Sequence, residues 1–259
     1  MPNNQSKTAV VTGGGSGIGA AAAKRLAKEG YKVCIIDIKE DRAEQVKEEI
    51  SGAGGEAFVL NVDVSDPARV SEAIGKVHEK WGSINVLFAN AGINGTVTSI
   101  EEMDPDEWDQ TITTNLKSTF LFVKYTIPHM KENGGSMIIT SSINGNRTFK
   151  NIGMSAYSTS KAGQTAFMKM AALELARYKI RVNAICPGAI DTNIDQNTFT
   201  EEGVEEVKIP IEYPEGNQPL ENKSGSSEQV ADLVYFLASD QSSHITGTKI
   251  YIDGAESLL

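Results

Sequence analysis

Short apolar runs alternate with longer helical patterns along most of this chain of 259 residues. The runs are rich in Val and Ile with little polar alternation, which is typical of strands buried on both faces of a parallel sheet. We expect strands at residues 8–12, 32–37, 57–62, 85–89, 136–141, 180–186 and 248–253, and helices at 17–29, 40–51, 67–80, 105–130, 155–177 and 227–238. This order predicts an α/β fold in which helices flank a doubly wound, mostly parallel seven-stranded sheet, in a single domain over residues 1–259.

Local signals support two helix starts and set one segment apart. Asp66-Pro67 and Asp104-Pro105 each place a capping carboxylate before a proline at the first helical position. The stretch 193–226 departs from the alternation, because it is polar and rich in Gly, Pro, Asn and Glu. We expect this insertion to form a lid or a wall of the substrate pocket, with a disordered surface loop as the alternative.

Charge and cysteine content restrict the classes of function. The formal net charge of -10 disfavours binding to nucleic acid or to an anionic membrane surface. No apolar run approaches the length of a bilayer span, and the polar start 1–7 does not resemble a signal peptide. Cys34 and Cys186 lie in apolar runs, which indicates buried reduced thiols, and no Cys/His cluster has metal-site spacing. We therefore expect a cytoplasmic protein without a bound metal.

The sequence TGGGSGIG at 12–19 joins the first predicted strand to the first predicted helix. Glycines let the backbone approach a pyrophosphate closely, and the helix N-terminus supplies free N–H groups and a positive dipole end. The generic G-x-G-x-x-G fingerprint fails here, because Ile18 stands where its last glycine belongs. The position between strand and helix nevertheless predicts a dinucleotide-binding Rossmann domain.

An acidic residue at the end of the second strand indicates which dinucleotide binds. Asp37 can accept hydrogen bonds from both adenosine ribose hydroxyls, and its charge repels a 2′-phosphate. The residue directly before Gly17 is Ser16 rather than a basic residue, and we expect Lys39 to face solvent. These features favour NAD over NADP.

Tyr157 and Lys161 place a phenol and an ammonium four residues apart in the predicted helix 155–177. Residues with this spacing lie on one helical face. A nearby ammonium stabilises the phenolate, so we expect the pKa of Tyr157 to be lowered and the phenol to serve as a proton donor and acceptor.

Together these features resemble the short-chain dehydrogenase/reductase family over nearly the whole chain. The motifs that carry the resemblance are Thr12-Gly13-x-x-x-Gly17-x-Gly19, Asn90-Ala91-Gly92, Asn115, Ser142, Tyr157-x-x-x-Lys161, Pro187-Gly188 with Thr192, and Tyr251-Ile252-Asp253-Gly254. The resemblance implies an NAD(H)-dependent oxidoreductase that transfers a hydride between the nicotinamide and a secondary alcohol or ketone.

The resemblance also implies which residues contact the cofactor. The glycine turn holds the pyrophosphate, Asp37 and Ile38 hold the adenosine ribose, and Asp63 lies beside the adenine. Asp63 could instead cap the next helix, although Asp66 suits that role better. The set implied to contact the cofactor is Gly13, Ser16, Gly17, Ile18, Gly19, Asp37, Ile38, Asp63, Val64, Asn90, Gly92, Tyr157, Lys161, Pro187, Gly188, Ile190 and Thr192.

By the same resemblance, Asn115, Ser142, Tyr157 and Lys161 form a catalytic tetrad. Tyr157 transfers the proton, Ser142 hydrogen-bonds the substrate oxygen, and Asn115 supports a water chain to Lys161. Ser141 is the rival of Ser142, because neighbouring strand residues face opposite sides of a sheet. Asn115 could instead satisfy backbone groups near its own helix.

The spacing from Ser142 to Tyr157 is slightly longer than the family's commonest spacing, so we expect an enlarged loop 143–154 in the pocket wall. This loop and the insertion 193–226 mix polar and apolar residues. They favour a neutral or modestly polar substrate, such as a sugar, a polyol, a hydroxyacid ester or a cyclic ketone.

Two other functions stay open at this point. A 3-oxoacyl-acyl-carrier-protein reductase is disfavoured by Asp37 and by the acidic insertion, since carrier proteins are acidic and those enzymes commonly use NADPH. A dinucleotide-binding regulator without turnover is disfavoured by the complete tetrad. The family resemblance finally implies a homotetramer that assembles through helices 105–130 and 155–177 and the last strand.

Overall fold

The seven predicted strands form one parallel sheet in a computed structural model that describes residues 7–201, 203–207, 209 and 217–259. The sheet order is β3-β2-β1-β4-β6-β7-β9. The strands are β1 Thr8–Thr12, β2 Lys32–Asp37, β3 Ala57–Asn61, β4 Val86–Ala89, β6 Gly135–Thr140, β7 Ile180–Pro187 and β9 Lys249–Ile252. The order reverses direction between β1 and β4, which is where doubly wound folds bind their ligands. The predicted fold class is therefore confirmed.

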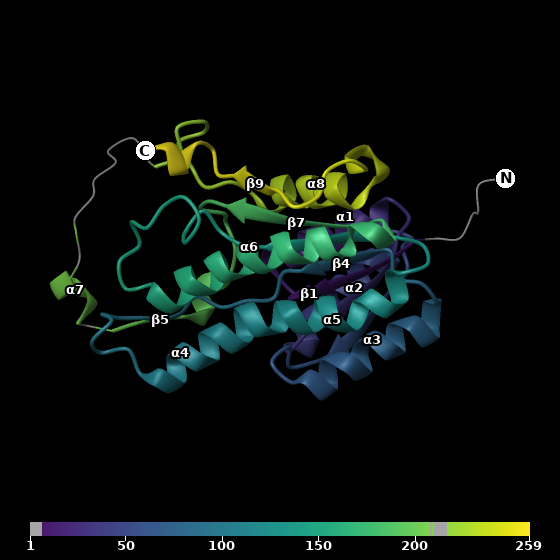
Figure 1. The fold of residues 1–259 in the computed structure, drawn as a ribbon, viewed down its shortest axis with the longest axis horizontal. Helices are drawn as coiled ribbons and strands as arrows, with labels where there is room; N and C mark the ends of the chain where they lie inside the picture. Colours follow the sequence, from purple (N-terminus) through teal and green to yellow (C-terminus); the bar gives the residue numbers. More distant parts are fainter. Residues whose placement is uncertain (1–6, 202, 208, 210–216) are drawn as a thin grey trace.

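Helices cover both faces of this sheet (Figure 1). The helices on one face are α3 Pro67–Trp81, α4 Pro105–Ile112, α5 Ser118–Met130 and α6 Ser155–Leu175. The helices on the other face are α1 Gly17–Lys28, α2 Glu40–Gly52 and α8 Ser227–Ala238. Two hydrophobic clusters correspond to these two faces. Because the central strands bury both sides, their Val and Ile runs carry no polar alternation.

The predicted helix starts are confirmed at their capping residues. The Asp66 carboxylate accepts hydrogen bonds from the backbone N–H groups of Ala68 and Arg69, and the Asp104 carboxylate accepts from that of Asp106. Side chains that accept from these otherwise unpaired N–H groups stabilise a helix by about 1 kcal/mol each.

The predicted helix 105–130 is interrupted by a π-helical turn, Thr113–Lys117. The hydroxyl groups of Ser118 and Thr119 and the side-chain amide of Gln164 all donate to the backbone carbonyl of Asn115. A carbonyl with these side-chain partners can leave the regular helical ladder, and π turns of this kind often mark functional sites.

Part of the insertion 193–226 has regular structure that the sequence did not indicate. It contains a 3-10 turn at Ile194–Asn197, the strand β8 at Thr198–Thr200 and the short helix α7 at Val204–Val207. Strand β8 pairs in parallel with β5, Gly95–Val97, which follows the end of β4. The remainder of the predicted insertion, at 202, 208 and 210–216, lies outside the described residues, as do residues 1–6 of the predicted polar start.

Candidate functional site

A cleft of about 1100 Å³ runs along the carboxyl edge of the sheet, where parallel strands end and the chain turns into helices or loops. Its volume suits a dinucleotide together with a small second molecule. The cleft brings together nearly all of the residues predicted for the site. Those that line it are Gly13, Ser16, Gly17, Ile18, Asp37, Ile38, Asp63, Val64, Asn90, Gly92, Ser142, Tyr157, Lys161, Pro187, Gly188, Ile190 and Thr192, whereas Gly19 and Asn115 lie behind its wall.

The glycine turn forms a backbone surface with no room for side chains at two positions. Gly13 has a φ of +63°, and a Cβ there would lie 3.0 Å from Cα of Ala91. A Cβ at Gly19 would lie 2.0 Å from the carbonyl oxygen of Gly13 and 2.8 Å from Nδ2 of Asn90. Helix α1 therefore begins directly against the end of β1, with no acidic residue in its first turn. Its free N–H groups fit an anionic pyrophosphate.

The Asp37 carboxylate is fixed at the end of β2 by two backbone donors. The N–H of Gly15 donates to Oδ2 at 2.9 Å, and the N–H of Lys39 donates to Oδ1 at 2.9 Å. Beside it, the Ile38 side chain is 59% exposed in the cleft wall. A carboxylate held in this way retains lone pairs for hydroxyl donors, which suits an adenosine ribose.

Arg42 at this end of the cleft was not predicted. It lies on α2, lines the cleft, and donates from Nη2 to Oε1 of Gln196 at 2.8 Å. Gln196 belongs to the insertion, so this bond joins the insertion to α2 in the wall of the cleft. Arg42 stands among many charged residues in the helix 40–51, so no sequence signal distinguishes it from its neighbours.

Asn90 holds three strand ends together at the middle of the cleft. Its Nδ2 donates to the carbonyl oxygen of Thr12 at 3.2 Å, and its Oδ1 accepts from the hydroxyl of Thr140 at 3.0 Å. Its own N–H donates to the Thr12 hydroxyl at 2.9 Å. These bonds fix the ends of β1, β4 and β6 relative to one another, so Asn90 shapes the groove through the fold as well as lining it.

Burial dominates the protonation chemistry of Tyr157 and Lys161. Burial raises the pKa of Tyr157, and a hydrogen bond with Ser142 offsets part of that rise. This direction is opposite to the expected lowering of the pKa by Lys161. Nζ of Lys161 lies 5.4 Å from the centroid of the phenol ring and donates to the carbonyl oxygen of Thr140 at 2.8 Å. Burial also lowers the pKa of Lys161 to about 8, so it carries less than a full charge in mildly alkaline solution.

Ser141 and Ser142 have different partners. The hydroxyl of Ser141 donates to the carbonyl oxygen of Lys161 at 2.8 Å and accepts from Nδ2 of Asn146 at 2.9 Å. The hydroxyl of Ser142 accepts from the N–H of Asn144 at 3.1 Å and lowers the pKa of Tyr157. Ser141 is thus engaged in holding α6, and Ser142 is the hydroxyl beside the phenol.

The Asn115 side chain is fully buried, at 0% exposure, and satisfies backbone and side-chain groups. Its Oδ1 accepts from the N–H of Ile93 at 2.8 Å, and its Nδ2 donates to the Ile93 carbonyl at 2.9 Å and to the Ser160 hydroxyl at 3.0 Å. These contacts match the alternative of a backbone role. They also fix the chain after Gly92 to the helix that carries Lys161.

The lowered pKa of Lys161 predicts a pH-dependent stability. The folded chain releases this proton near pH 8, whereas the unfolded chain holds it to about pH 10.5. Between these values the unfolded state binds more protons, so the free energy of unfolding rises with pH. We expect Lys161→Met to be more stable than the wild type at pH 7, and the difference to shrink by about 3 kcal/mol by pH 10.5.

Urea unfolding of both proteins at pH 7 and at pH 10.5 measures this difference directly. Comparing the two proteins cancels the titration of the other groups. A difference that stays constant with pH would show that Lys161 has an ordinary pKa in the folded protein.

Further residues that line the cleft include Asp106, Asp109, Asn144 and Glu256. Asp106 and Asp109 are exposed residues of α4 that bring negative charge to the cleft wall, and Asn144 lies two residues after Ser142. Glu256 comes from the chain after β9 and is 6% exposed. Its place after the last strand was the one available signal, because the carboxyl ends of parallel strands meet at a single edge.

Comparisons with known proteins show the family to which this chain belongs. A family described as enoyl-(acyl carrier protein) reductase matches residues 13–255. The uncharacterized oxidoreductase YxbG of Bacillus subtilis is 38% identical over 98% of this chain and 92% of its own length. The trans-4-hydroxycyclohexanecarboxylate dehydrogenase of Sinomonas cyclohexanicum is 36% identical over 97% of this chain and 93% of its own length.

Two solved structures share the fold over almost their whole length. A 3-ketoacyl-ACP reductase from Sinorhizobium meliloti 1021 superimposes with a TM-score of 0.94 and 45% identity, covering 97% of this chain and 99% of that one. A 3-ketoacyl-(acyl-carrier-protein) reductase from Brucella melitensis, complexed with NADH, has a TM-score of 0.84 and 31% identity over 97% of this chain and 98% of that one. The chain belongs to the short-chain dehydrogenase/reductase family and is an oxidoreductase that acts on CH–OH groups with a nicotinamide dinucleotide.

Proposed function

We propose that this enzyme interconverts a secondary alcohol and a ketone with NAD(H), with Tyr157 as the acid and base. The observation that carries the proposal is the position of Tyr157, Ser142 and Lys161 in one cleft with the glycine turn and Asp37. The cleft thus offers an anion-binding turn and a proton-transfer group along a single groove. The cofactor contacts that we propose are the residues of the predicted set that line it.

A nicotinamide dinucleotide held by the glycine turn and Asp37 would supply the hydride to the substrate carbon or accept it from that carbon. In reduction, Tyr157 donates its proton to the carbonyl oxygen, and in oxidation its phenolate takes the proton back. Ser142 donates a hydrogen bond to the same oxygen and stabilises negative charge there. The Lys161 ammonium, held against Thr140, stabilises the phenolate that remains after proton donation.

We propose that Asp37 makes the enzyme prefer NADH to NADPH. The Asp37 carboxylate is oriented by Gly15 and Lys39, and a 2′-phosphate would bring like charge beside it. Asp37→Ala should reduce the ratio of kcat/KM for NADH to that for NADPH by about a hundredfold. Steady-state kinetics with both cofactors measure this ratio.

Asp41→Ala is the matched control, because it removes an exposed carboxylate from the start of α2, four residues after Asp37. It should leave the ratio unchanged. If Asp37→Ala also left the ratio unchanged, another group would set the preference. Arg42 would then be the residue to test, because it lines the same end of the cleft.

The proposed substrate is a compact neutral ketone or alcohol, with a cyclic ketone as the leading class. The substrate half of the cleft combines Asn144, Asn151 and Asn193 with Ile143 and Met154. This mixture suits an apolar ring with few polar substituents. The similarity to a dehydrogenase named for a hydroxycyclohexane carboxylate supports the same class.

A 3-oxoacyl-carrier-protein reductase is the second candidate. The 45% identical structure of a 3-ketoacyl-ACP reductase favours it. The exposed carboxylates of Asp106 and Asp109 in the cleft wall oppose it, because they would repel an acidic carrier. The complete set of Tyr157, Lys161 and Ser142 in one cleft disfavours a regulator without turnover.

NADH oxidation across a panel of cyclic ketones, diketones, sugars, 3-oxoesters and a 3-oxoacyl thioester tests the proposal. NADPH is assayed in parallel. We expect turnover of a cyclic ketone with NADH. Turnover restricted to the thioester with NADPH would overturn both the substrate class and the cofactor preference.

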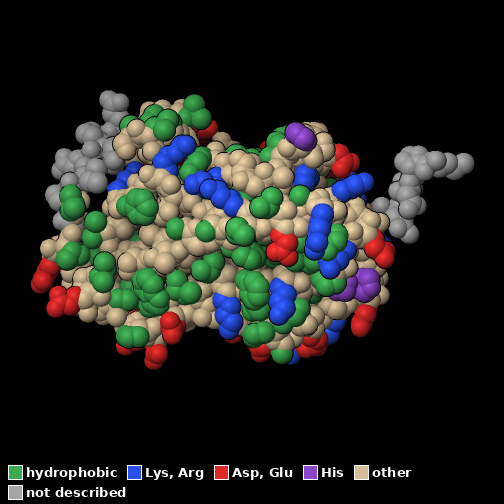
Figure 2. All heavy atoms as spheres, viewed as in Figure 1, with side chains coloured by type: hydrophobic (Ala, Val, Ile, Leu, Met, Phe, Trp, Pro, Cys, Tyr) green, Lys and Arg blue, Asp and Glu red, His purple; other side chains and the backbone are tan. Residues whose placement is uncertain are grey.

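We further propose a cytoplasmic homotetramer. Hydrophobic side chains gather on the face formed by α4, α5 and α6 (Figure 2). Among them, Phe120 is 44% exposed on α5, and Leu173 is 78% exposed on α6. Burial of such a face between copies stabilises an assembly. Sedimentation equilibrium measures the mass, and Leu173→Glu should shift it toward smaller species.

A further inference from the structure

We propose that Glu256 is a positioning residue for the reaction, which holds the substrate side of the pocket together from the chain after β9. The inference rests on the proposed function, because it assigns Glu256 to the pocket in which Tyr157 would act. Glu256 lines the cleft in which Tyr157 and Ser142 lie. Nothing in the sequence motifs of the site includes this carboxylate.

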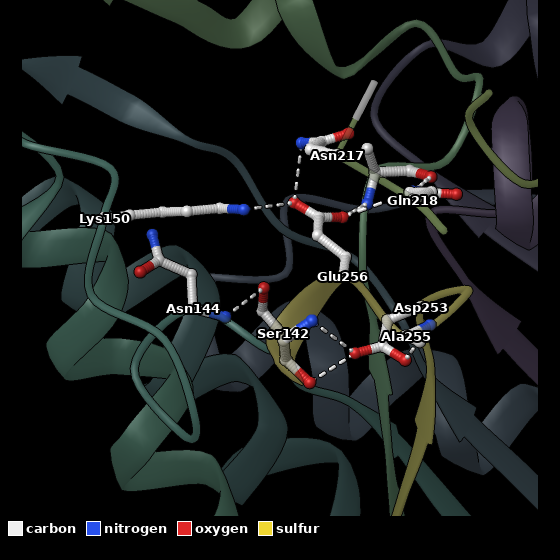
Figure 3. Close-up of polar contacts among 10 residues, drawn as sticks. Ser142, Asn144, Lys150, Asn217, Gln218, Asp253, Ala255 and Glu256 are labelled. Atoms are coloured by element: carbon white, nitrogen blue, oxygen red, sulfur yellow. Dashed lines mark hydrogen bonds and ion pairs between the residues drawn. The ribbon is translucent and has the colours of Figure 1, made fainter. Parts of the chain in front are cut away.

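Three hydrogen-bond donors and the ammonium of Lys150, from three segments, converge on the Glu256 carboxylate (Figure 3). Its Oε2 accepts from the N–H of Ala189 at 2.8 Å and from Nε2 of Gln218 at 3.2 Å. Its Oε1 accepts from Nδ2 of Asn217 at 3.1 Å and lies 3.3 Å from Nζ of Lys150. The two carboxylate oxygens of Glu256 therefore contact different residues.

The three segments are the ones that shape the pocket around the reacting atoms. Ala189 follows Pro187-Gly188, two residues of the set predicted to contact the cofactor. Asn217 and Gln218 belong to the insertion, and Lys150 belongs to the enlarged loop 143–154. One carboxylate thus fixes the relative positions of all three.

Burial makes these contacts strong. The side chain of Glu256 is 7% exposed and that of Lys150 is 15% exposed. In such surroundings an ion pair is poorly screened by water, and removal of one partner leaves the other charge uncompensated. The backbone also approaches closely here, because a Cβ at Gly188 would lie 2.6 Å from Oε2 of Glu256.

The enlarged loop 143–154 contacts the C-terminal segment at a second point. The guanidinium of Arg147 lies 3.8 Å from the centroid of the Tyr251 ring, and its Nη1 donates to the hydroxyl of Ser257 at 3.3 Å. Lys150 pairs with Glu256 itself, and Arg147 contacts Tyr251 before it and Ser257 after it in the sequence. This contact gives the longer Ser142–Tyr157 spacing a structural role.

The C-terminal segment is itself held in a defined conformation. The Asp253 carboxylate accepts from the N–H groups of Ala255 and Ser257 and from the Ser257 hydroxyl. Ala255 has a φ of +71°, in the left-handed region that a non-glycine residue rarely adopts. The surrounding contacts maintain this conformation, and it directs Glu256 into the protein.

The substitution Glu256→Gln disrupts the contacts of one carboxylate oxygen and keeps those of the other. The amide oxygen can still accept from Ala189 and Gln218, whereas the amide nitrogen would face the donors of Asn217 and Lys150. We expect KM for the ketone to rise about tenfold, with kcat changed less than about threefold and the Kd for NADH nearly unchanged. Glu256→Ala removes all four contacts and should weaken NADH binding as well.

Two further variants make the test specific. Lys150→Met should raise the same KM, and the double variant Lys150→Met/Glu256→Gln should be less than additive, because both changes disrupt one pair. Glu174→Gln is the control, since it removes an exposed carboxylate from α6 and should leave KM unchanged.

Amide hydrogen exchange provides a measurement that does not depend on turnover. In Glu256→Gln, exchange should become faster in 143–154 and at 217–225 and stay unchanged in the sheet. If KM and exchange both match the wild type, Glu256 does not position these segments. A uniform loss of kcat, NADH affinity and global stability would assign it a structural role only. Failure of the wild type on every ketone would count against the proposed function, while exchange would still decide the role of Glu256.

Discussion

Tyr157→Phe should lose at least about a thousandfold in kcat while it retains NADH binding. The substitution removes one oxygen from a partly buried ring and leaves the ring volume and the position of Lys161 in place. Reduction then lacks its proton donor, because Ser142 is beside the reacting oxygen but is too weak an acid to replace the phenol. Pre-steady-state mixing with NADH measures the chemical step, and fluorescence titration measures NADH affinity.

Tyr178→Phe is the matched control, because it removes a tyrosine hydroxyl outside the cleft and keeps a ring against Arg177 and Lys131. Its kcat should equal that of the wild type. If Tyr157→Phe kept wild-type turnover, the phenol would not transfer the proton. If the NADH affinity of Tyr157→Phe fell as much as its kcat, the lost turnover would reflect a damaged cofactor site rather than the loss of the proton donor.

Gly19→Ala should abolish dinucleotide binding or folding altogether. The new Cβ would lie 2.0 Å from the Gly13 carbonyl oxygen and 2.8 Å from Nδ2 of Asn90. The start of α1 must then move away from β1, or the strand ends joined by Asn90 must separate. We expect destabilisation by about 3 kcal/mol or more, because an overpacked backbone contact relaxes poorly. Urea unfolding and NADH titration measure the two effects.

Gly75→Ala makes the same chemical change in helix α3, at a site where a Cβ meets nothing within 4 Å. It should stabilise the protein by about 0.5–1 kcal/mol through helix propensity, with NADH binding unchanged. Normal NADH binding by Gly19→Ala would show that the close approach of α1 to β1 is not required for the site.

The sheet and its helices could be predicted because burial on both faces imposes a simple pattern. The strands Lys32–Asp37 and Thr8–Thr12 begin and end where their apolar runs do. Helix α8 starts at Ser227 after a Ser226 cap that forms a full capping box with Gln229. In these elements the capping residues and the pattern of buried residues indicate the same structure, so the sequence alone predicts them.

The features that were missed depend on contacts between distant parts of the chain. The π turn at Thr113–Lys117 is stabilised by a Gln164 side chain from another helix. Strand β8 pairs with β5 across about a hundred residues of sequence. Glu256 looks like an ordinary carboxylate in the sequence, and its role appears only when Lys150 and Asn217 are brought to it.

The protonation of the site differed from expectation for a related reason. A spacing of four residues predicts that Tyr157 and Lys161 lie near each other, and they do. It contains no information on how deeply they are buried, and burial is the largest influence on both pKa values. A lowered Lys161 pKa and a raised Tyr157 pKa both follow from loss of water around the charged form.

The most direct test of hydride transfer uses NADH deuterated at C4 of the nicotinamide on the transferred face. The enzyme is incubated with the ketones of the panel, and each alcohol product is analysed by mass spectrometry. Hydride transfer within the cleft predicts that the wild type forms an alcohol with deuterium on the carbinol carbon. This alcohol is one mass unit heavier than the alcohol formed with unlabelled NADH, and Tyr157→Phe should not form it. Oxidation of NADH without a deuterated alcohol from any ketone would contradict the account.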